Sequence, residues 1–141
     1  MNDGVIIRSI ADADAPAVQA LWSAVFPDAR PWNQPAAYLP RKRALGDDLV
    51  LVAERDGAIV GAVAAGWDGV RGWIHHLAVA ESARRLGVGS ALMAEAERRL
   101  RARGCPKVNL QVLAHNQAVV RFYARLGYAV EERISMGKAM A

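Results

Sequence analysis

The sequence predicts an α/β fold in which a mixed β-sheet is flanked by four helices. The length of 141 residues is that of one domain, so we expect a single domain over residues 1–141. Hydrophobic residues make up 53% of the chain and charged residues 23%, which provides the apolar surface for a folded core. Short apolar runs with the period of a strand alternate with segments that have the period of a helix, and this order is typical of α/β proteins.

The first half of the chain contains three predicted strands and two predicted helices. Residues 4–10 predict a strand, and an amphipathic helix follows with Pro16 in its first turn. Prolines then interrupt the chain, and a short helix is expected over residues 36–45. Residues 49–54 and 58–67 flank an Arg-Asp-Gly turn, which predicts a β-hairpin.

The second half predicts a strand over residues 73–79, a helix over 87–103, a strand over 107–112, a helix that begins after Asn116, and a closing strand over 128–136. The strands on either side of the first of these helices should pair in parallel through a right-handed crossover. The complete order, β-α-α-β-β-β-α-β-α-β, gives six strands.

Charge is distributed unevenly along the chain. Residues 1–70 carry 6 Lys+Arg and 9 Asp+Glu, a net charge of −3, whereas residues 71–141 carry 12 and 5, a net charge of +7. A basic half attracts anions, so a phosphate-rich cofactor and a nucleic acid are both candidate ligands. Cys105 is the only cysteine, which excludes an internal disulfide and a Cys-based zinc site. We expect a cytoplasmic protein with no metal and no membrane span.

The most informative segment is residues 77–90 (LAVAESARRLGVGS), where an apolar strand enters a helix through a turn with two glycines. Free N–H groups at the start of a helix form an anion site, and Gly87 and Gly89 would let a pyrophosphate approach the backbone. No Walker A triplet is present, and position 92 is Leu where a dinucleotide fingerprint needs a third glycine. The remaining pattern is Arg84-x-x-Gly87-x-Gly89.

This pattern resembles the acetyl-CoA pyrophosphate motif of the GNAT N-acetyltransferases, Gln/Arg-x-x-Gly-x-Gly/Ala. Residues 116–128 (NQAVVRFYARLGY) are similar to the second signature of the family, and the element order matches over essentially the whole length. RPWN at 30–33, WDGVRG at 67–72 and RGCPK at 103–107 resemble the bacterial YpeA-type subgroup. The resemblance implies a GNAT fold, with a single mixed sheet of six to seven strands in which strands four and five splay apart.

The resemblance also implies acetyl-CoA as co-substrate. Its pyrophosphate would lie at the glycine turn, and its pantetheine arm would lie along the exposed backbone of the fourth strand. Asn116 would contact that arm, and it also suits the cap of the helix that follows. The residues expected to bind the cofactor are Leu77, Ala78, Val79, Arg84, Arg85, Leu86, Gly87, Val88, Gly89, Ser90, Asn116 and Tyr123.

Acetyl transfer to an amine needs a polarised thioester carbonyl and a proton for the leaving thiolate. The family's catalytic tyrosine falls on Tyr123, which would be the acid. The alternative is that Tyr123 is a core residue, because it belongs to the apolar stripe of its helix. The backbone N–H of Val79 and its neighbours is the implied oxyanion donor.

Acetyl transfer also needs a neutral amine, and the predicted fourth strand contains no carboxylate that could act as the base. Its two histidines, His75 and His76, are candidate bases that should face opposite sides of the strand. A structural role for either histidine is an equal alternative. Glu54 is a more distant candidate, and a chain of water molecules is another route for the proton.

The acceptor site is expected to involve the first helix, the loop after it, and the third and fourth strands. Trp32, Asn33, Trp67 and Arg71 are its candidate residues, because a tryptophan outside the core can stack on a cationic amine. The family implies direct transfer to a primary amine in a ternary complex.

Two other functions are consistent with parts of the sequence. The missing carboxylate in the fourth strand favours a non-catalytic acetyl-CoA-binding sensor or interaction module. Arginines of the predicted 87–103 helix suggest nucleic-acid binding, but glutamates interrupt the run and no aromatic platform accompanies it. We therefore expect a small-molecule, peptide or protein amine as partner, no nucleic acid and no membrane, and a homodimer is compatible with the family.

Overall fold

The computed structural model describes residues 4–140. Contacts within the chain divide it into two compact units, one up to Gln111 and one from Val112 onward. No helix among the described residues is long and apolar enough to cross a membrane.

A single five-stranded sheet with the strand order β1-β2-β3-β4-β5 forms the centre of the first unit. The strands are β1 (Val5–Ser9), β2 (Val50–Arg55), β3 (Ala58–Trp67), β4 (Gly72–Val79) and β5 (Val108–Leu110). Neighbouring strands are antiparallel except β4 and β5, which are parallel. The predicted mixed sheet and its parallel crossover are confirmed.

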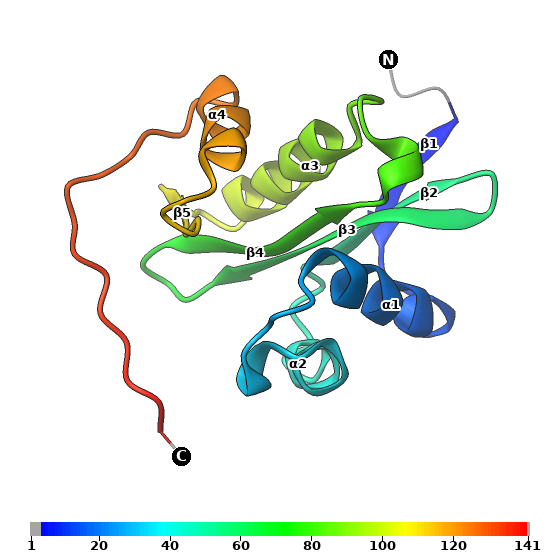
Figure 1. Ribbon diagram of the computed structural model, residues 1–141, viewed down its shortest axis with the longest axis horizontal. Helices are drawn as coiled ribbons and strands as arrows, with labels where there is room; N and C mark the ends of the chain where they lie inside the picture. The colour runs from blue at the N-terminus through cyan, green and yellow to red at the C-terminus, as the bar shows by residue number, and fades with distance from the viewer. Residues whose placement is uncertain (1–3, 141) are drawn as a thin grey trace. The chain divides into compact units, whose positions relative to one another are not determined.

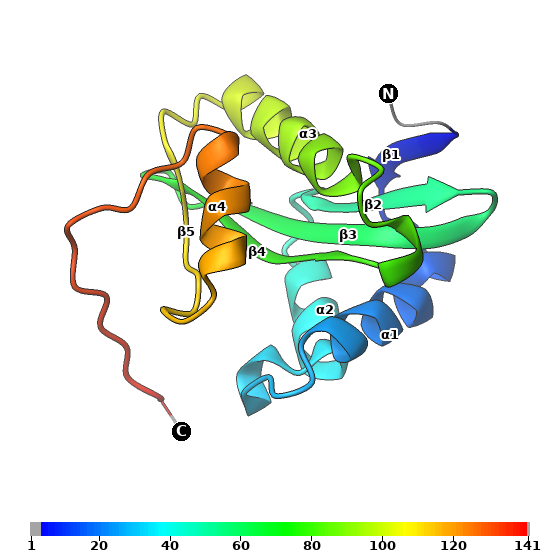
Figure 2. The ribbon, with the colours of Figure 1, turned by 45° about the horizontal axis from the view of Figure 1, so that its top comes forward.

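Helices cover both faces of this sheet. Figures 1 and 2 show α1 (Ala15–Val25) and α2 (Pro35–Arg43) on one face and α3 (Val88–Ala102) on the other. Trp22 of α1 and Leu39 of α2 are buried against β2, β3 and β4 in one hydrophobic cluster. The apolar helical spacing in the sequence therefore places each helix with its apolar face on the sheet.

Gly61 of β3 lets α3 pack closely against the other face. A β-carbon at this position would lie 2.8 Å from Cγ1 of Val88 and 3.0 Å from Cδ1 of Leu92. Both are α3 side chains that are buried. The distance between α3 and the sheet therefore depends on a residue without a side chain at position 61.

The second unit contains α4 (Gln117–Arg125) and an extended segment after it. The prediction of a closing strand over residues 128–136 is wrong, and with it the expected six to seven strands. The segment alternates apolar and polar residues, but Val130, Ile134 and Met136 are 86%, 90% and 90% exposed. A strand needs a neighbour for its N–H and C=O groups, and among the described residues of this unit α4 is the only regular element.

Candidate functional site

The turn between β4 and α3 presents free backbone N–H groups. A 3-10 turn, Glu81–Ala83, follows β4, and left-handed residues at Arg85 (φ 71°) and Gly87 (φ 76°) then bring the chain into α3. The first intrahelical bond runs from Ala91 N–H to the carbonyl of Gly87 at 3.0 Å. Helix geometry leaves the three preceding N–H groups, those of Val88, Gly89 and Ser90, without an intrahelical acceptor.

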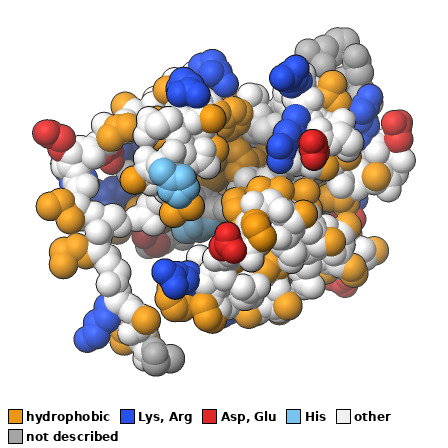
Figure 3. Space-filling view, viewed as in Figure 1, with side chains coloured by type: hydrophobic (Ala, Val, Ile, Leu, Met, Phe, Trp, Pro, Cys, Tyr) orange, Lys and Arg blue, Asp and Glu red, His pale blue; other side chains and the backbone are white. Residues whose placement is uncertain are grey.

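Nothing in the described start of α3 neutralises its positive end. The first turn of the helix contains no acidic residue, and no side chain caps it. Arg84 and Arg85 are exposed beside it, and Figure 3 shows Lys and Arg side chains over the turn between β4 and α3. The helix dipole, the free N–H groups and the two guanidinium groups together favour an anion of the size of a phosphate.

One edge of β4 is unpaired next to this turn. The pairing of β5 with β4 covers only Gly72 to Ile74, so the last five residues of β4 extend beyond it. Ala80 N–H bonds the carbonyl of Val60 in β3 at 2.8 Å. Because strand N–H groups alternate in direction, the N–H of Val79 is directed away from β3, towards the unpaired edge.

A β-bulge interrupts β4 at His76 and Leu77. His75 pairs with Ala64 and Ala78 pairs with Ala62, so two residues of β4 stand opposite Val63 alone. The backbone of His76 is left-handed, with φ 57°. The prediction that His75 and His76 face opposite sides of the strand is wrong, because the extra residue breaks the alternation on which it depended.

The His76 ring lies among aromatic side chains of α1 and the residues around α2. Its centroid is 4.4 Å from the stacked ring of Tyr38, 5.0 Å from Trp22 and 5.6 Å from Phe26. Burial lowers the pKa of His76, although a hydrogen bond with the backbone of Asn33 acts in the opposite direction. Its Nδ1 is buried without a partner among the described residues. His76 is therefore neutral at pH 7 with one ring nitrogen unused.

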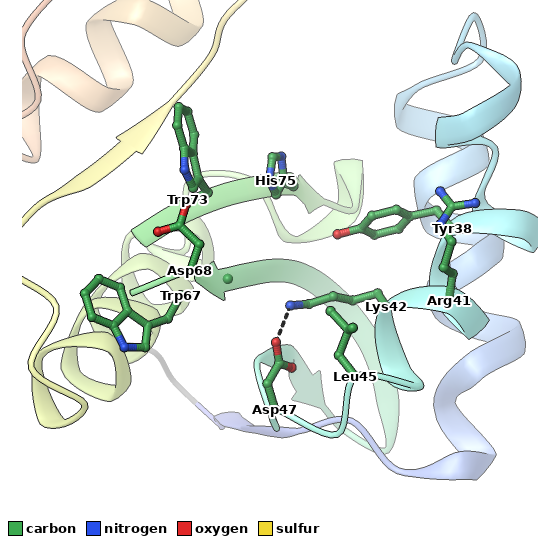
Figure 4. A pocket seen from close by; sticks show the side chains of 10 residues that line it. Tyr38, Arg41, Lys42, Leu45, Asp47, Trp67, Asp68, Trp73 and His75 are labelled. Carbon is green, nitrogen blue, oxygen red and sulfur yellow. Dashed lines mark hydrogen bonds and ion pairs between the residues drawn. The ribbon is translucent and has the colours of Figure 1, made fainter. Parts of the chain in front are cut away.

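His75 borders a cavity of about 350 Å³ between α2 and the β3–β4 hairpin (Figure 4). Burial lowers the pKa of His75, with a further contribution from the positive charge of Lys42. Part of the ring remains exposed. The cavity is lined by Tyr38, Arg41, Lys42, Leu45, Asp47, Gly66, Trp67, Asp68, Trp73 and His75.

Two α2 side chains point into this cavity towards His75, as Figure 4 shows for Tyr38 and Lys42. Lys42 Nζ lies 2.7 Å from Oδ2 of Asp47, and the lysine side chain is only 7% exposed. Burial, together with the negative charge of Asp47, raises the pKa of Tyr38 to about 12. At neutral pH the cavity therefore contains a protonated phenol and an uncharged imidazole beside the Lys42–Asp47 ion pair.

The predicted acceptor residues lie partly at this cavity. Trp67 lines it. Trp32 and Asn33 belong to the turn Pro31–Asn33 before α2, where the Trp32 carbonyl accepts from Arg41 at 2.6 Å. Arg71 does not line the cavity, and its backbone N–H donates to Asp68 in the β3–β4 turn at 2.8 Å.

Sequence reasoning missed Tyr38, Lys42 and Trp73 as cavity residues. Tyr38 and Lys42 are four positions apart on the predicted helix over residues 36–45, so they share one helical face. Trp73 precedes His75 by two positions, and the two rings stack at 6.4 Å. These spacings were the signal in the sequence, but the sequence does not show on which face of the sheet the side chains would pack.

Tyr123 and Asn116 belong to the second unit. Asn116 caps α4, and its side-chain oxygen accepts from the N–H of Val119 at 3.4 Å. Tyr123 is 9% exposed, with its ring 5.0 Å from Phe122 and 5.7 Å from Tyr128. Burial raises the pKa of Tyr123 to about 12, so the phenol keeps its proton at neutral pH.

Two residues with reactive side chains are engaged elsewhere in the first unit. Glu54 of β2 lies 2.8 Å from the guanidinium of Arg8, which also binds Asp14. Cys105 donates to the carbonyl of Lys107 at 3.2 Å. Both side chains therefore contribute to local structure.

Two of the three arginines of α3 form ion pairs. Arg98 and Arg99 lie 2.7 Å and 2.8 Å from Glu95, and Arg99 also bonds the hydroxyl of Ser9. These ion pairs reduce the positive charge that the helix could present to a nucleic acid.

Comparisons with known proteins place the chain in a family. The Acetyltransferase (GNAT) family matches residues 15–128. An acetyltransferase of Pectobacterium atrosepticum is 41% identical over 134 residues, which cover 95% of this chain and 94% of that protein. Ard1 from Thermoplasma volcanium has a TM-score of 0.80 and 26% identity, covering 91% of this chain and 84% of that one. The aminoglycoside N-acetyltransferase AAC(6')-Iy, solved in complex with CoA, has the same fold, with a TM-score of 0.78 at 19% identity over 97% of this chain and 95% of that one. The chain therefore belongs to the GNAT family of acyl-CoA-dependent N-acetyltransferases.

Proposed function

We propose that this protein moves an acetyl group from acetyl-CoA to a primary amine, by direct transfer within a ternary complex. The observation that carries the proposal is the anion site at the start of α3, directly beside the unpaired edge of β4. Membership of the GNAT family supports the choice of acetyl-CoA as the anionic ligand. The CoA complex of AAC(6')-Iy concerns that protein, and it shows that this fold can hold the cofactor.

The pyrophosphate of acetyl-CoA binds at the turn of residues 84–90. The N–H groups from Leu86 to Ser90 bind its oxygens, and Arg84 and Arg85 contribute charge. The pantetheine arm bonds the outward backbone groups of the β4 edge over residues 77–79, as an added strand would, and there it replaces the hydrogen bond from Arg84 Nε to the Val79 carbonyl. Asn116, whose oxygen caps α4, supplies its side-chain NH₂ to the same arm.

The reaction forms a bond from the amine nitrogen to the acetyl carbon and breaks the bond from that carbon to sulfur. The N–H of Val79 and its neighbours stabilises the developing oxyanion. His75, or His76, accepts the proton that the amine loses, because a neutral imidazole is available at pH 7. Tyr123 donates the proton that the leaving thiolate takes up.

A non-catalytic acetyl-CoA-binding module is the second candidate. No carboxylate occurs in β4, and the more distant Glu54 is held by Arg8. A sensor would need the cofactor site at α3 but neither a base nor an acid.

The first experiment measures the thermal midpoint with and without acetyl-CoA, with ATP and NAD as controls. At about 100 times its Kd, a ligand that binds only the folded state adds roughly 2.7 kcal/mol, or roughly 8–10 °C for a domain of this size. A shift specific to acetyl-CoA supports the cofactor site, and no shift contradicts it. Release of CoA thiol with an amine panel then separates the enzyme from the binding module, which binds acetyl-CoA and transfers nothing.

A further inference from the structure

We infer that the acceptor is a small primary amine that carries a carboxylate next to the amine, as a free α-amino acid does, and that it binds in the cavity between α2 and the β3–β4 hairpin. This inference rests on the proposed acetyl transfer and names its substrate class. The carboxylate binds to Tyr38, Arg41 and Lys42, and the amine lies next to His75.

The position of the cavity fits an acceptor site. The pairing of β5 with β4 ends at Ile74, and the next residue, His75, lines the cavity. The unpaired edge runs over the five residues from His75 to Val79, a span of roughly 13 Å at about 3.3 Å per residue step. A pantetheine arm that starts at the α3 turn and follows this edge therefore ends beside the cavity. Its volume of about 350 Å³ is within the range of sites for small ligands.

The charges of the cavity favour a carboxylate. Asp47 takes one of the three donors of the Lys42 ammonium, which leaves two donors in the cavity. Arg41 adds a guanidinium whose hydrogen bond goes to the neutral Trp32 carbonyl, and within residues 4–140 it has no carboxylate partner. Tyr38 presents a protonated hydroxyl on the same side. An anion on the ligand would pair with these donors.

Asp68, which lines the other end of the cavity, does not take the place of the ligand's carboxylate. Its Oδ1 accepts the N–H groups of Val70 at 2.7 Å and Arg71 at 2.8 Å. These bonds lower the pKa of Asp68, and a side-chain hydrogen bond with Trp73 acts in the same direction. Asp68 therefore holds the hairpin turn, and next to α2 the two cationic side chains, Arg41 and Lys42, face the single carboxylate of Asp47.

The same positive charge favours the reactive form of the amine. A cation near an ammonium lowers the pKa of that ammonium, so Lys42 promotes loss of its proton. His75 is uncharged and able to accept it. A carboxylate next to the amine offsets the repulsion by Lys42 during binding. The rings of Trp67 and Trp73 line the remaining wall and can contact an apolar side chain of the acceptor.

The test compares each α-amino acid with its own amide, for example phenylalanine with phenylalaninamide, by the release of CoA thiol. The amide has the less basic amine, so chemistry alone favours the amide at neutral pH. We expect kcat/KM to be about tenfold or more in favour of the free acid, the size of a hydrogen-bonded charge contact. Lys42→Gln should abolish this preference, and so should Arg41→Gln, an exposed position that serves if Lys42→Gln does not fold.

Arg43→Gln is the matched control on the same helix, because Arg43 pairs with the exposed Asp12 outside the cavity and should keep the preference. Acetylation of polyamines, peptides or amides in preference to free amino acids would overturn the inference and leave the proposed acetyl transfer intact. Loss of the acetyl-CoA thermal shift, or binding without transfer to any amine, would overturn both. Direct calorimetric titration of the amino acid into the protein saturated with CoA gives a second readout, and no binding there contradicts the inference.

Discussion

His76 combines a left-handed backbone, which is uncommon for a residue with a β-carbon, with a half-buried ring. The bulge turns its imidazole into the aromatic cluster of Trp22, Phe26 and Tyr38. Protonating this ring would place a charge among apolar groups, which is why burial lowers its pKa. Strain of this kind is characteristic of functional positions, which supports a role for this part of β4 in the reaction.

The lowered pKa values of both β4 histidines predict a loss of stability in mild acid. Below pH 6.5 the unfolded chain binds protons at these histidines while the folded chain does not, so the free energy of unfolding falls as the pH decreases. Asp14 and Glu95 stay ionised in this range, because hydrogen bonds from arginines lower their pKa values. Urea unfolding at pH 7.5 and pH 5.0 measures the effect. His76→Phe should show a smaller fall between the two pH values, and an equal fall would contradict this explanation.

Tyr123 provides the second prediction at the scale of a residue. Its pKa of about 12 means that Tyr123→Phe removes a proton donor, and the ring contacts with Phe122 and Tyr128 are retained. Loss of a general acid lowers kcat by about 10²- to 10⁴-fold. The acetyl-CoA thermal shift should be nearly unchanged, since the anion site is at α3. Full turnover in this variant would remove Tyr123 from the mechanism.

Two glycines of β3 give a matched pair at the scale of the elements. In Gly61→Ala the new β-carbon meets buried side chains of α3, so α3 must move away from the sheet. We expect a loss of about 1–3 kcal/mol in the free energy of unfolding. In Gly66→Ala the β-carbon meets only Lys42 Nζ, at 3.8 Å, and folding should be nearly unaffected.

The same pair separates stability from acceptor binding. Gly66→Ala adds a methyl group to the lining of the cavity, so KM for the amine should rise while the acetyl-CoA thermal shift is retained. Chemical unfolding and steady-state kinetics on both variants measure the two effects. Equal stability of the two alanine variants would show that α3 tolerates displacement from the sheet.

The elements differ in how far the sequence could predict them. Strong periodicity predicted α1, α3 and the β2–β3 hairpin, because each depends on residues near one another in the chain, and the rule for β-α-β units predicted the parallel pairing of β4 with β5. The bulge in β4 could not be predicted, because one extra residue opposite Val63 does not change the pattern of an alternating sequence. Residues 128–136 have the alternation of a strand, but alternation specifies a face and does not supply a neighbouring strand.

The candidate site was likewise only partly predictable from the sequence. Glycines and arginines at 84–89 specify a local turn, so the anion site was predictable from adjacent residues. The cavity unites α2 with the β3–β4 hairpin, segments that are separated in sequence by about twenty residues or more, and only the packing of α2 on the sheet brings Lys42 to His75.

At the scale of the whole chain, the +7 charge of residues 71–141 is not equally available to a ligand. Arg98 pairs with Glu95 and Arg99 pairs with Glu95 and Asp48, whereas Arg84 and Arg85 are exposed next to the free N–H groups of α3. The affinity for the pyrophosphate should therefore depend on Arg84 and Arg85. We expect Arg84→Gln and Arg85→Gln each to raise the Kd for acetyl-CoA roughly tenfold.

Arg98→Gln is the control for this prediction, because it removes the same net charge from the chain without altering the turn. Its Kd should stay within about twofold of the unmodified protein, since Arg98 is paired with Glu95 and lies about 15 Å along α3 from Val88 at about 1.5 Å per residue. That is more than the Debye length of about 10 Å at 0.1 M salt, so its charge is screened. Calorimetry at 0.05 M and 0.5 M salt completes the test, and the affinity of the unmodified protein should fall more steeply with salt than that of Arg84→Gln. If Arg98→Gln weakened binding as much as Arg84→Gln, the attraction would come from net charge alone, and the turn would lose its role as the pyrophosphate site.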